Sequence, residues 1–227
     1  MLLLDREAFW KTLREHGIGW KGIASIVVFV IAACAVYGAV MALGRSPRLA
    51  LYAAVKLPLL FVGSTAIVAL FNWIVATTLG AGLSFRDSVA LTFASMGVAC
   101  WIFLAFAPIA LFFTLTGVPN VGEAPTEDVS FAYRIILLTH VTILAIAGVA
   151  GNASLFNGLR ATVRPQCPTA ALFAAWIALF AIVGCQLSWI LRPFVGNPFA
   201  EVAFLRDDAL RGNFFEFVFG NLLPNFL

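Results

Sequence analysis

Charge is scarce in this chain of 227 residues: only 11% are Asp, Glu, Lys or Arg, against about 25% in a soluble domain. Hydrophobic residues make up 62%, and the mean hydropathy is +1.00. This composition excludes secreted disulfide scaffolds, disordered tails and nucleic-acid-binding domains. The composition therefore predicts a membrane protein, whose surroundings are mainly lipid.

Residues for metal, disulfide or catalytic chemistry are also few. The chain has four cysteines and two histidines, and no CxxC pair, so neither a zinc site nor a disulfide framework is expected. The phosphate-binding loop GxxxxGK[ST], the nucleophile elbow GxSxG and the zinc-protease motif HExxH are absent from the sequence. We therefore expect no catalysis, no cofactor and no metal.

The sequence contains many long apolar runs. A helix needs about 20 apolar residues to cross a hydrocarbon core of about 30 Å. Five stretches meet this requirement: 23–43, 57–79, 88–116, 132–157 and 169–191. The expected fold is an all-α, polytopic transmembrane bundle of five helices.

Local signals place the ends of several of these spans. The second begins at Pro58, which suits a first helical turn, and the third follows a capping box formed by Ser84 and Asp87. The third is too long for an upright span, so we expect tilt or a kink near Pro108. The fourth ends at Gly158, which follows an asparagine in a typical helix C-terminus.

Amphipathic helices on the membrane surface are expected at both ends of the chain, outside the transmembrane domain of residues 23–192. Residues 1–22 set apolar side chains among charges, as interfacial helices do; packing of this segment on the protein's own loops is the alternative. Residues 193–227 form a C-terminal interfacial segment. Within it, Asn213 and Glu216 resemble a helix cap.

Orientation in the membrane follows from Lys and Arg in the flanks of the spans. Lys and Arg are evenly divided between the two sides, but four of them cluster near the N-terminus, at Arg6, Lys11, Arg14 and Lys21. The only charges of loop 118–130 are acidic. We therefore predict that the N-terminus lies inside and the C-terminus outside.

Four polar side chains form a possible intramembrane site: Asn72, His140, Asn152 and Gln186. Polar and ionisable residues at membrane depth are costly, which makes them candidates for function. Convergence on a water-filled cavity would favour a transporter or channel. Separate helix contacts would favour structural roles.

His140 is the histidine within a span, and it allows two interpretations. It could ligate a haem or a pigment, although His16 cannot supply a second ligand from the surface helix. Alternatively, it makes a structural hydrogen bond to Thr139, Thr142 or a backbone carbonyl of another helix. We favour the structural role.

Charged residues after the fifth span form the predicted partner-binding surface. They lie at a water boundary, where charges pair selectively. The residues are Arg192, Arg206, Asp207, Asp208 and Arg211. The alternative is that they only hold the segment against phospholipid headgroups.

The C-terminal region also carries a family resemblance. The motif Q-x-x-W-x-L-R-P-F from Gln186 to Phe194, with the sequences 204–206, 213–216 and 51–58, resembles a group of bacterial inner-membrane proteins with five spans and no known reaction. Residues 79–85, followed by a span with a proline, look like the wider YIP-domain family, whose eukaryotic members work in vesicle trafficking. The resemblance implies a bacterial inner (cytoplasmic) membrane and no catalytic residue. With the orientation predicted from Lys and Arg, the N-terminus is then cytoplasmic and the C-terminus periplasmic.

Together these patterns predict an integral membrane scaffold or an accessory subunit of a larger membrane assembly. Its expected partners are membrane lipids and other membrane-protein subunits or a second copy of itself, with no nucleic acid. A small-solute transporter or channel is the alternative. A pigment- or haem-binding subunit that uses His140 is the third possibility.

Overall fold

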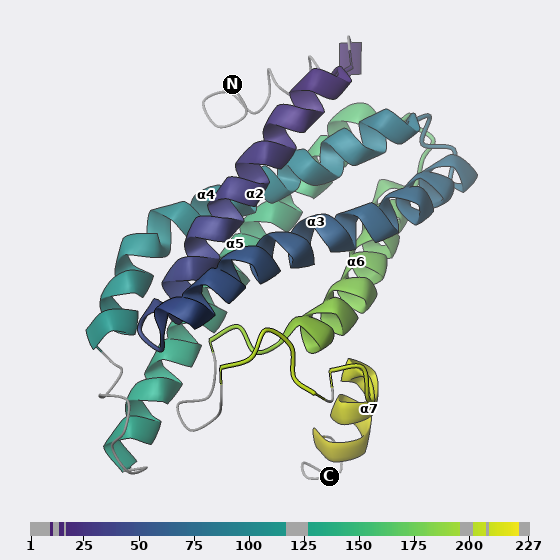
Figure 1. The fold of residues 1–227 in the computed structure, drawn as a ribbon. Helices are drawn as coiled ribbons and strands as arrows, with labels where there is room; N and C mark the ends of the chain where they lie inside the picture. Colours follow the sequence, from purple (N-terminus) through teal and green to yellow (C-terminus); the bar gives the residue numbers. More distant parts are fainter. Residues whose placement is uncertain are drawn as a thin grey trace.

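The computed structural model describes residues 10, 14–15, 17–116, 127–195, 202–207 and 209–222, apart from the side chains of 127–130 and 221–222. Its elements, labelled as in Figure 1, are α2 (Trp20–Leu43), α3 (Pro47–Thr78), α4 (Phe85–Thr116), α5 (Glu127–Thr162), α6 (Thr169–Leu191), the short α7 (Phe214–Phe217) and the π-helical turn η1 (Val218–Leu222). Among the described residues there is no strand.

Five of these helices, α2 to α6, are long and apolar enough to cross a membrane. Each overlaps one of the five predicted spans, so the prediction of an all-α, multi-pass membrane bundle is confirmed. Most of the predicted surface helix over 1–22 lies outside the described residues. Trp10 of that segment is buried beside Gly158 of α5.

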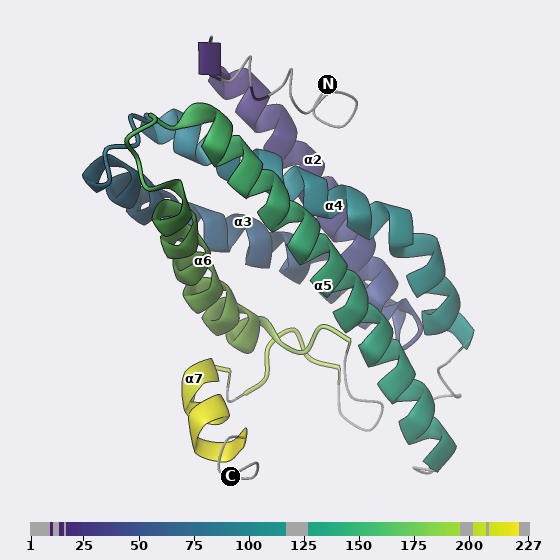
Figure 2. The same ribbon diagram turned by 180° about the vertical axis from the view of Figure 1, so that it is seen from behind.

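The helices run alternately in opposite directions through the bundle. The N-terminal end of α2 and the C-terminal segment therefore lie at opposite ends of it (Figures 1 and 2). The helix α2 packs on both α3 and α4, while α4 also packs on α5 and α3 on α6. From their shared connection, α5 and α6 diverge (Figure 2).

The start of α3 differs from the prediction. The helix begins at Pro47, after Ser46 accepts a hydrogen bond from the Leu49 N–H at 3.1 Å. Pro58 lies inside the helix rather than in its first turn. Lys56, just before the predicted start, is fully buried in the bundle. The residues ahead of Pro58 therefore already belong to the packed part of the helix.

The end of α5 was also predicted too early. The helix continues past Gly158 to Thr162. Gly158 is a packing position, because a Cβ there would lie 2.9 Å from Leu91 and 3.0 Å from the Trp10 ring. The glycine permits close contact with α4 and with Trp10 and does not end the helix.

The predicted capping box before α4 is confirmed. The Asp87 N–H donates to the Ser84 hydroxyl at 3.2 Å, and the Ser84 N–H donates to the Asp87 carboxylate at 3.2 Å. The helix continues through Pro108 and bends over its C-terminal part (Figure 2). A proline removes one hydrogen bond of the helix and crowds the preceding turn, which accounts for the expected kink.

The crossing of α2 and α3 depends on a glycine. A Cβ on Gly38 would collide with the backbone carbonyl of Ala53 in α3. Small residues allow helix backbones to approach closely in membranes, where packing rather than the hydrophobic effect holds helices together. Gly38 thus brings α3 against α2.

We predict that Gly38→Ala lowers the free energy of unfolding by about 1–3 kcal/mol, the usual cost of overpacking. Gly148 on α5 is the matched control, because a Cβ there meets nothing within 4 Å. Gly148→Ala should be neutral or stabilising by up to about 1 kcal/mol. Unfolding of both variants in mixed detergent micelles measures the difference. Equal effects would show that this glycine does not set the helix crossing.

Candidate functional site

A buried lysine joins the C-terminal segment to the bundle. Lys56 lies about 15 Å along α3 and has no solvent-exposed surface. Its ammonium group donates a hydrogen bond to the backbone oxygen of Pro193 at 2.8 Å. The same group lies 5.1 Å from the centroid of the Phe204 ring.

These contacts explain how an ammonium group can be buried in an apolar helix. A charge away from water is costly unless it is paired or hydrogen-bonded. The Pro193 oxygen supplies a hydrogen bond and the Phe204 ring supplies a cation–π contact. Both partners belong to the chain after α6, so the C-terminal segment supplies the cover for Lys56. We did not predict a role for Lys56 from the sequence, although a lysine between two apolar runs is a signal for a buried, paired charge.

Two of the predicted partner-binding arginines pack on a tryptophan of the same chain. The guanidinium carbon of Arg192 lies 3.1 Å from the centroid of the Trp189 ring, and that of Arg206 lies 5.7 Å from it. The ring of Phe217 lies 5.0 Å from Trp189. Arg192 and Arg206 therefore help to fold the C-terminal segment against the end of α6.

The Gln186 side chain fastens the last helix to α6. Its oxygen accepts a hydrogen bond from the Phe214 N–H at 3.1 Å. The predicted cap is confirmed, because the Glu216 N–H donates to the Asn213 side chain at 2.7 Å. Gln186 thus makes a structural contact at one end of the bundle.

Another part of the predicted partner surface faces outward. Asp207, Leu210 and Arg211 are exposed, Leu210 to 82%, while Ala209 between them is buried. The Ala209 N–H donates to the Arg206 oxygen at 2.9 Å, which fixes a turn. We refer to Asp207, Leu210 and Arg211 as the exposed turn. Asp208 lies outside the described residues.

His140 is buried between three helices. Its Nδ1 lies 3.0 Å from the Tyr37 hydroxyl of α2, and its Nε2 lies 3.5 Å from the Thr114 hydroxyl of α4. Thr139, a neighbour considered as a partner, donates instead to the Ile135 oxygen. Both ring nitrogens of His140 thus have partners on other helices, as a structural role requires.

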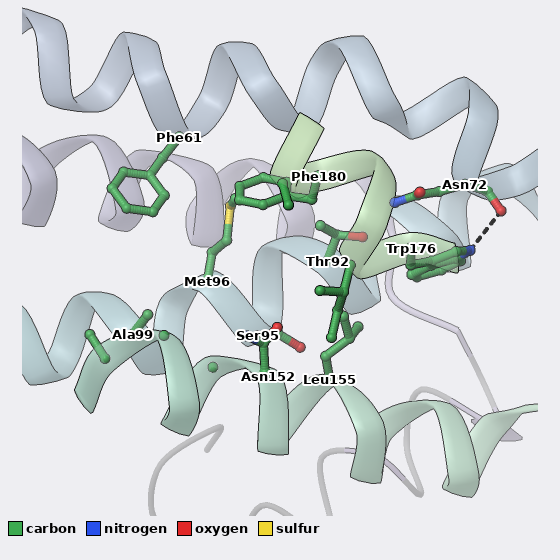
Figure 3. Close-up of a pocket in the computed structure, with 15 residues that line it drawn as sticks. Phe61, Asn72, Thr92, Ser95, Met96, Ala99, Asn152, Leu155, Trp176 and Phe180 are labelled. Carbon is green, nitrogen blue, oxygen red and sulfur yellow. Dashed lines mark hydrogen bonds between the residues drawn. The ribbon is translucent and has the colours of Figure 1, made fainter. Parts of the chain in front are cut away.

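A cavity of about 230 Å³ lies between α3, α4, α5 and α6 (Figure 3). Asn72 and Asn152 line it from α3 and α5, among mainly apolar side chains. The Trp176 N–H donates to the backbone oxygen of Asn72 at 2.9 Å. Of the four predicted intramembrane polar residues, the structure brings Asn72 and Asn152 to one cavity. His140 and Gln186 make contacts elsewhere.

Metal ligands do not gather in the part of the chain that the structure describes. No group of three or more His, Cys, Asp or Glu residues is placed to hold an ion there. The sulfur atoms of Cys34 and Cys100 lie 3.7 Å apart in the bundle interior. This pair alone is too small a ligand set for zinc.

The contact between His140 and Tyr37 generates the second prediction. His140→Leu should lower the free energy of unfolding by about 1–3 kcal/mol, because it leaves the buried Tyr37 hydroxyl without its partner. Adding Tyr37→Phe should restore part of this loss, since removing both partners leaves no unpaired polar group. Unfolding of the two single variants and the double variant measures the coupling. Additive losses, or a visible absorption band that disappears in His140→Gln, would contradict the structural role.

The third prediction concerns the cover of Lys56. In Lys56→Met, trypsin should cleave after Arg206 at least about fivefold faster, because loss of about 1 kcal/mol or more of docking energy opens the segment more often. Lys21→Met is the matched control, because Lys21 is an exposed lysine at the start of α2, at the other end of the bundle from the C-terminal segment. Mass spectrometry of the released peptides measures the rate. Equal rates in both variants would show that Lys56 does not hold the segment.

Comparison with models of known protein families, with curated proteins and with solved structures finds no match for this chain. The resemblances to five-span bacterial inner-membrane proteins and to YIP-domain proteins stay predictions. The contacts of the bundle and its C-terminal segment are therefore the basis for assigning a function.

Proposed function

We propose that this protein is a non-catalytic scaffold or accessory subunit of a membrane assembly, and that it binds a partner through the exposed turn. The membrane is the bacterial inner membrane, with the N-terminus in the cytoplasm. The observation that carries the proposal is the position of an exposed leucine between an exposed acid and an exposed base, in a turn at one end of the bundle.

Contacts of the residues just before the exposed turn hold it in place. Phe204 covers Lys56, and Arg206 packs near Trp189. A binding surface that is already ordered loses less conformational entropy when a partner binds. The turn is therefore suited to specific recognition.

The chemistry of the turn indicates what kind of partner it suits. Leu210 offers an apolar anchor, while Asp207 and Arg211 offer charges of opposite sign. Complementary charges on a partner would fix its orientation and exclude wrong partners. The suitable partner is another membrane protein that presents a small apolar pocket with one basic and one acidic group at its rim.

Orientation in the membrane supports the same proposal. The basic N-terminal cluster favours a cytoplasmic N-terminus, and the C-terminal segment lies at the opposite end of the bundle (Figure 1). The exposed turn would then face the periplasm. Separation of His140 and Gln186 from the cavity favours a scaffold over a continuous transport path.

Photocrosslinking tests the proposed surface. A photoreactive amino acid at Leu210 should give a discrete crosslinked protein band in intact cells, because the partner covers this side chain. The same amino acid at Val28, which is 65% exposed on α2, is the matched control and should give mainly lipid adducts.

A charge variant then separates a protein partner from a lipid surface. Arg211→Gln should reduce the crosslink at Leu210 while the five-span protein still inserts and the segment stays docked. Lipid adducts alone at Leu210, unchanged by Arg211→Gln, would contradict the proposal and support a simple headgroup anchor.

A further inference from the structure

The cavity between α3, α4, α5 and α6 is large enough for an aromatic or quinone ring with substituents. Its volume is about 230 Å³, whereas an engineered apolar cavity of about 150 Å³ already binds benzene. Three aromatic side chains line it, Phe61, Trp176 and Phe180, and none of its lining residues is charged. Aromatic side chains favour stacked or edge-to-face contact with another ring. The wall therefore suits an uncharged, planar ligand.

The cavity opens sideways, toward the space that lipid occupies. Three of its lining residues are also exposed on the outer surface of the bundle: Gly148, Asn152 and Ala181. They lie on α5 and α6, the two helices that diverge in Figure 2. A ligand would therefore enter from the membrane rather than from water.

The Asn72 side chain directs a hydrogen-bond donor into the cavity. The residue is only 3% exposed, and its side-chain oxygen is enclosed by protein. The nitrogen of the same carboxamide points along the cavity, toward Phe180 and Thr92 (Figure 3). This nitrogen makes no hydrogen bond to any residue drawn in Figure 3. An N–H group in an apolar site costs free energy until it finds an acceptor, so a ligand that brings an acceptor is favoured.

The lack of charge in the wall restricts which acceptor this N–H group can bind. A carboxylate or a phosphate would be left without a counter-ion, which is costly away from water. The ester carbonyl of a glycerolipid is uncharged, but it carries a polar headgroup that an apolar cavity does not suit. A quinone presents an uncharged carbonyl oxygen on a planar ring and dissolves in lipid. A quinone therefore matches both the donor and the aromatic wall.

We propose that the cavity binds the ring of a lipid-soluble quinone, with one ring carbonyl oxygen accepting a hydrogen bond from the Asn72 side-chain nitrogen. The ring lies among the aromatic side chains of the wall. An apolar tail on the ring leaves through the mouth between α5 and α6 and stays in the bilayer. This site is separate from the exposed turn, so it adds a small-molecule ligand to a protein proposed to bind a partner protein.

Photolabelling with benzophenone, an uncharged ketone with two aromatic rings, tests this site. The full-length protein is placed in phosphatidylcholine vesicles, and labelled peptides are identified by mass spectrometry. Labelling should fall on residues around the cavity. Duroquinone should compete about fivefold better than durene, which has the same methyl groups on a benzene ring but no carbonyl oxygen. Labelling of lipid-facing residues of α2 in the same sample corrects for the light that duroquinone absorbs.

Two variants separate the hydrogen bond from the space. Asn72→Leu should abolish the preference for duroquinone over durene, because leucine has no donor. Ala181→Phe should block labelling of the cavity, because residue 181 lines it, whereas Ala178→Phe, at an exposed position of α6 outside the lining, should not. A melting temperature for each variant identifies any that fail to fold. The comparison of duroquinone with durene on the unaltered protein then decides alone.

Several results would overturn the proposal. Equal competition by duroquinone and durene would show that no donor in the cavity recognises the carbonyl. Labelling of Ala181→Phe at the level of Ala178→Phe would place the ring elsewhere. Stronger competition by methyl decanoate than by duroquinone would assign the cavity to the acyl ester of a lipid instead of a quinone.

Discussion

The hydrogen bond from Lys56 to the Pro193 oxygen is the contact on which the position of the C-terminal segment depends. An ammonium group on a membrane-embedded helix must be covered, and the residues that cover it follow the last span. The chain after α6 therefore folds back against α3 and does not continue along the membrane surface. The packing of Trp189 and the outward position of Leu210 follow from that path.

The same helix organises the opposite side of the bundle through Asn72. Its backbone oxygen accepts a hydrogen bond from the Trp176 N–H of α6 at 2.9 Å, and its side chain lines the cavity. Because α5 diverges from α6, this region stays open toward lipid. One helix thus contributes both to the docking of the C-terminal segment at one end and to the cavity further along the bundle.

Local signals in the sequence were enough for the spans and for two helix caps. Hydropathy located five helices, and the patterns at Ser84 and Asn213 predicted caps because each involves residues only three positions apart. Contacts between distant helices carry no such signal. The pairing of Lys56 with Pro193 joins residues far apart in sequence, and the interior position of Pro58 reflects tertiary packing over local preference. The cavity was equally hidden, because its walls come from four helices.

Spin labels at Leu51 and Leu210 test the docking of the C-terminal segment most directly. Both side chains are exposed, on α3 and on the exposed turn, and the labels are attached to cysteines in a chain without its native cysteines. If the segment is fixed to α3 as described, the electron–electron distance has a single narrow distribution in lipid vesicles. A distribution as broad as that of a free tail would contradict it.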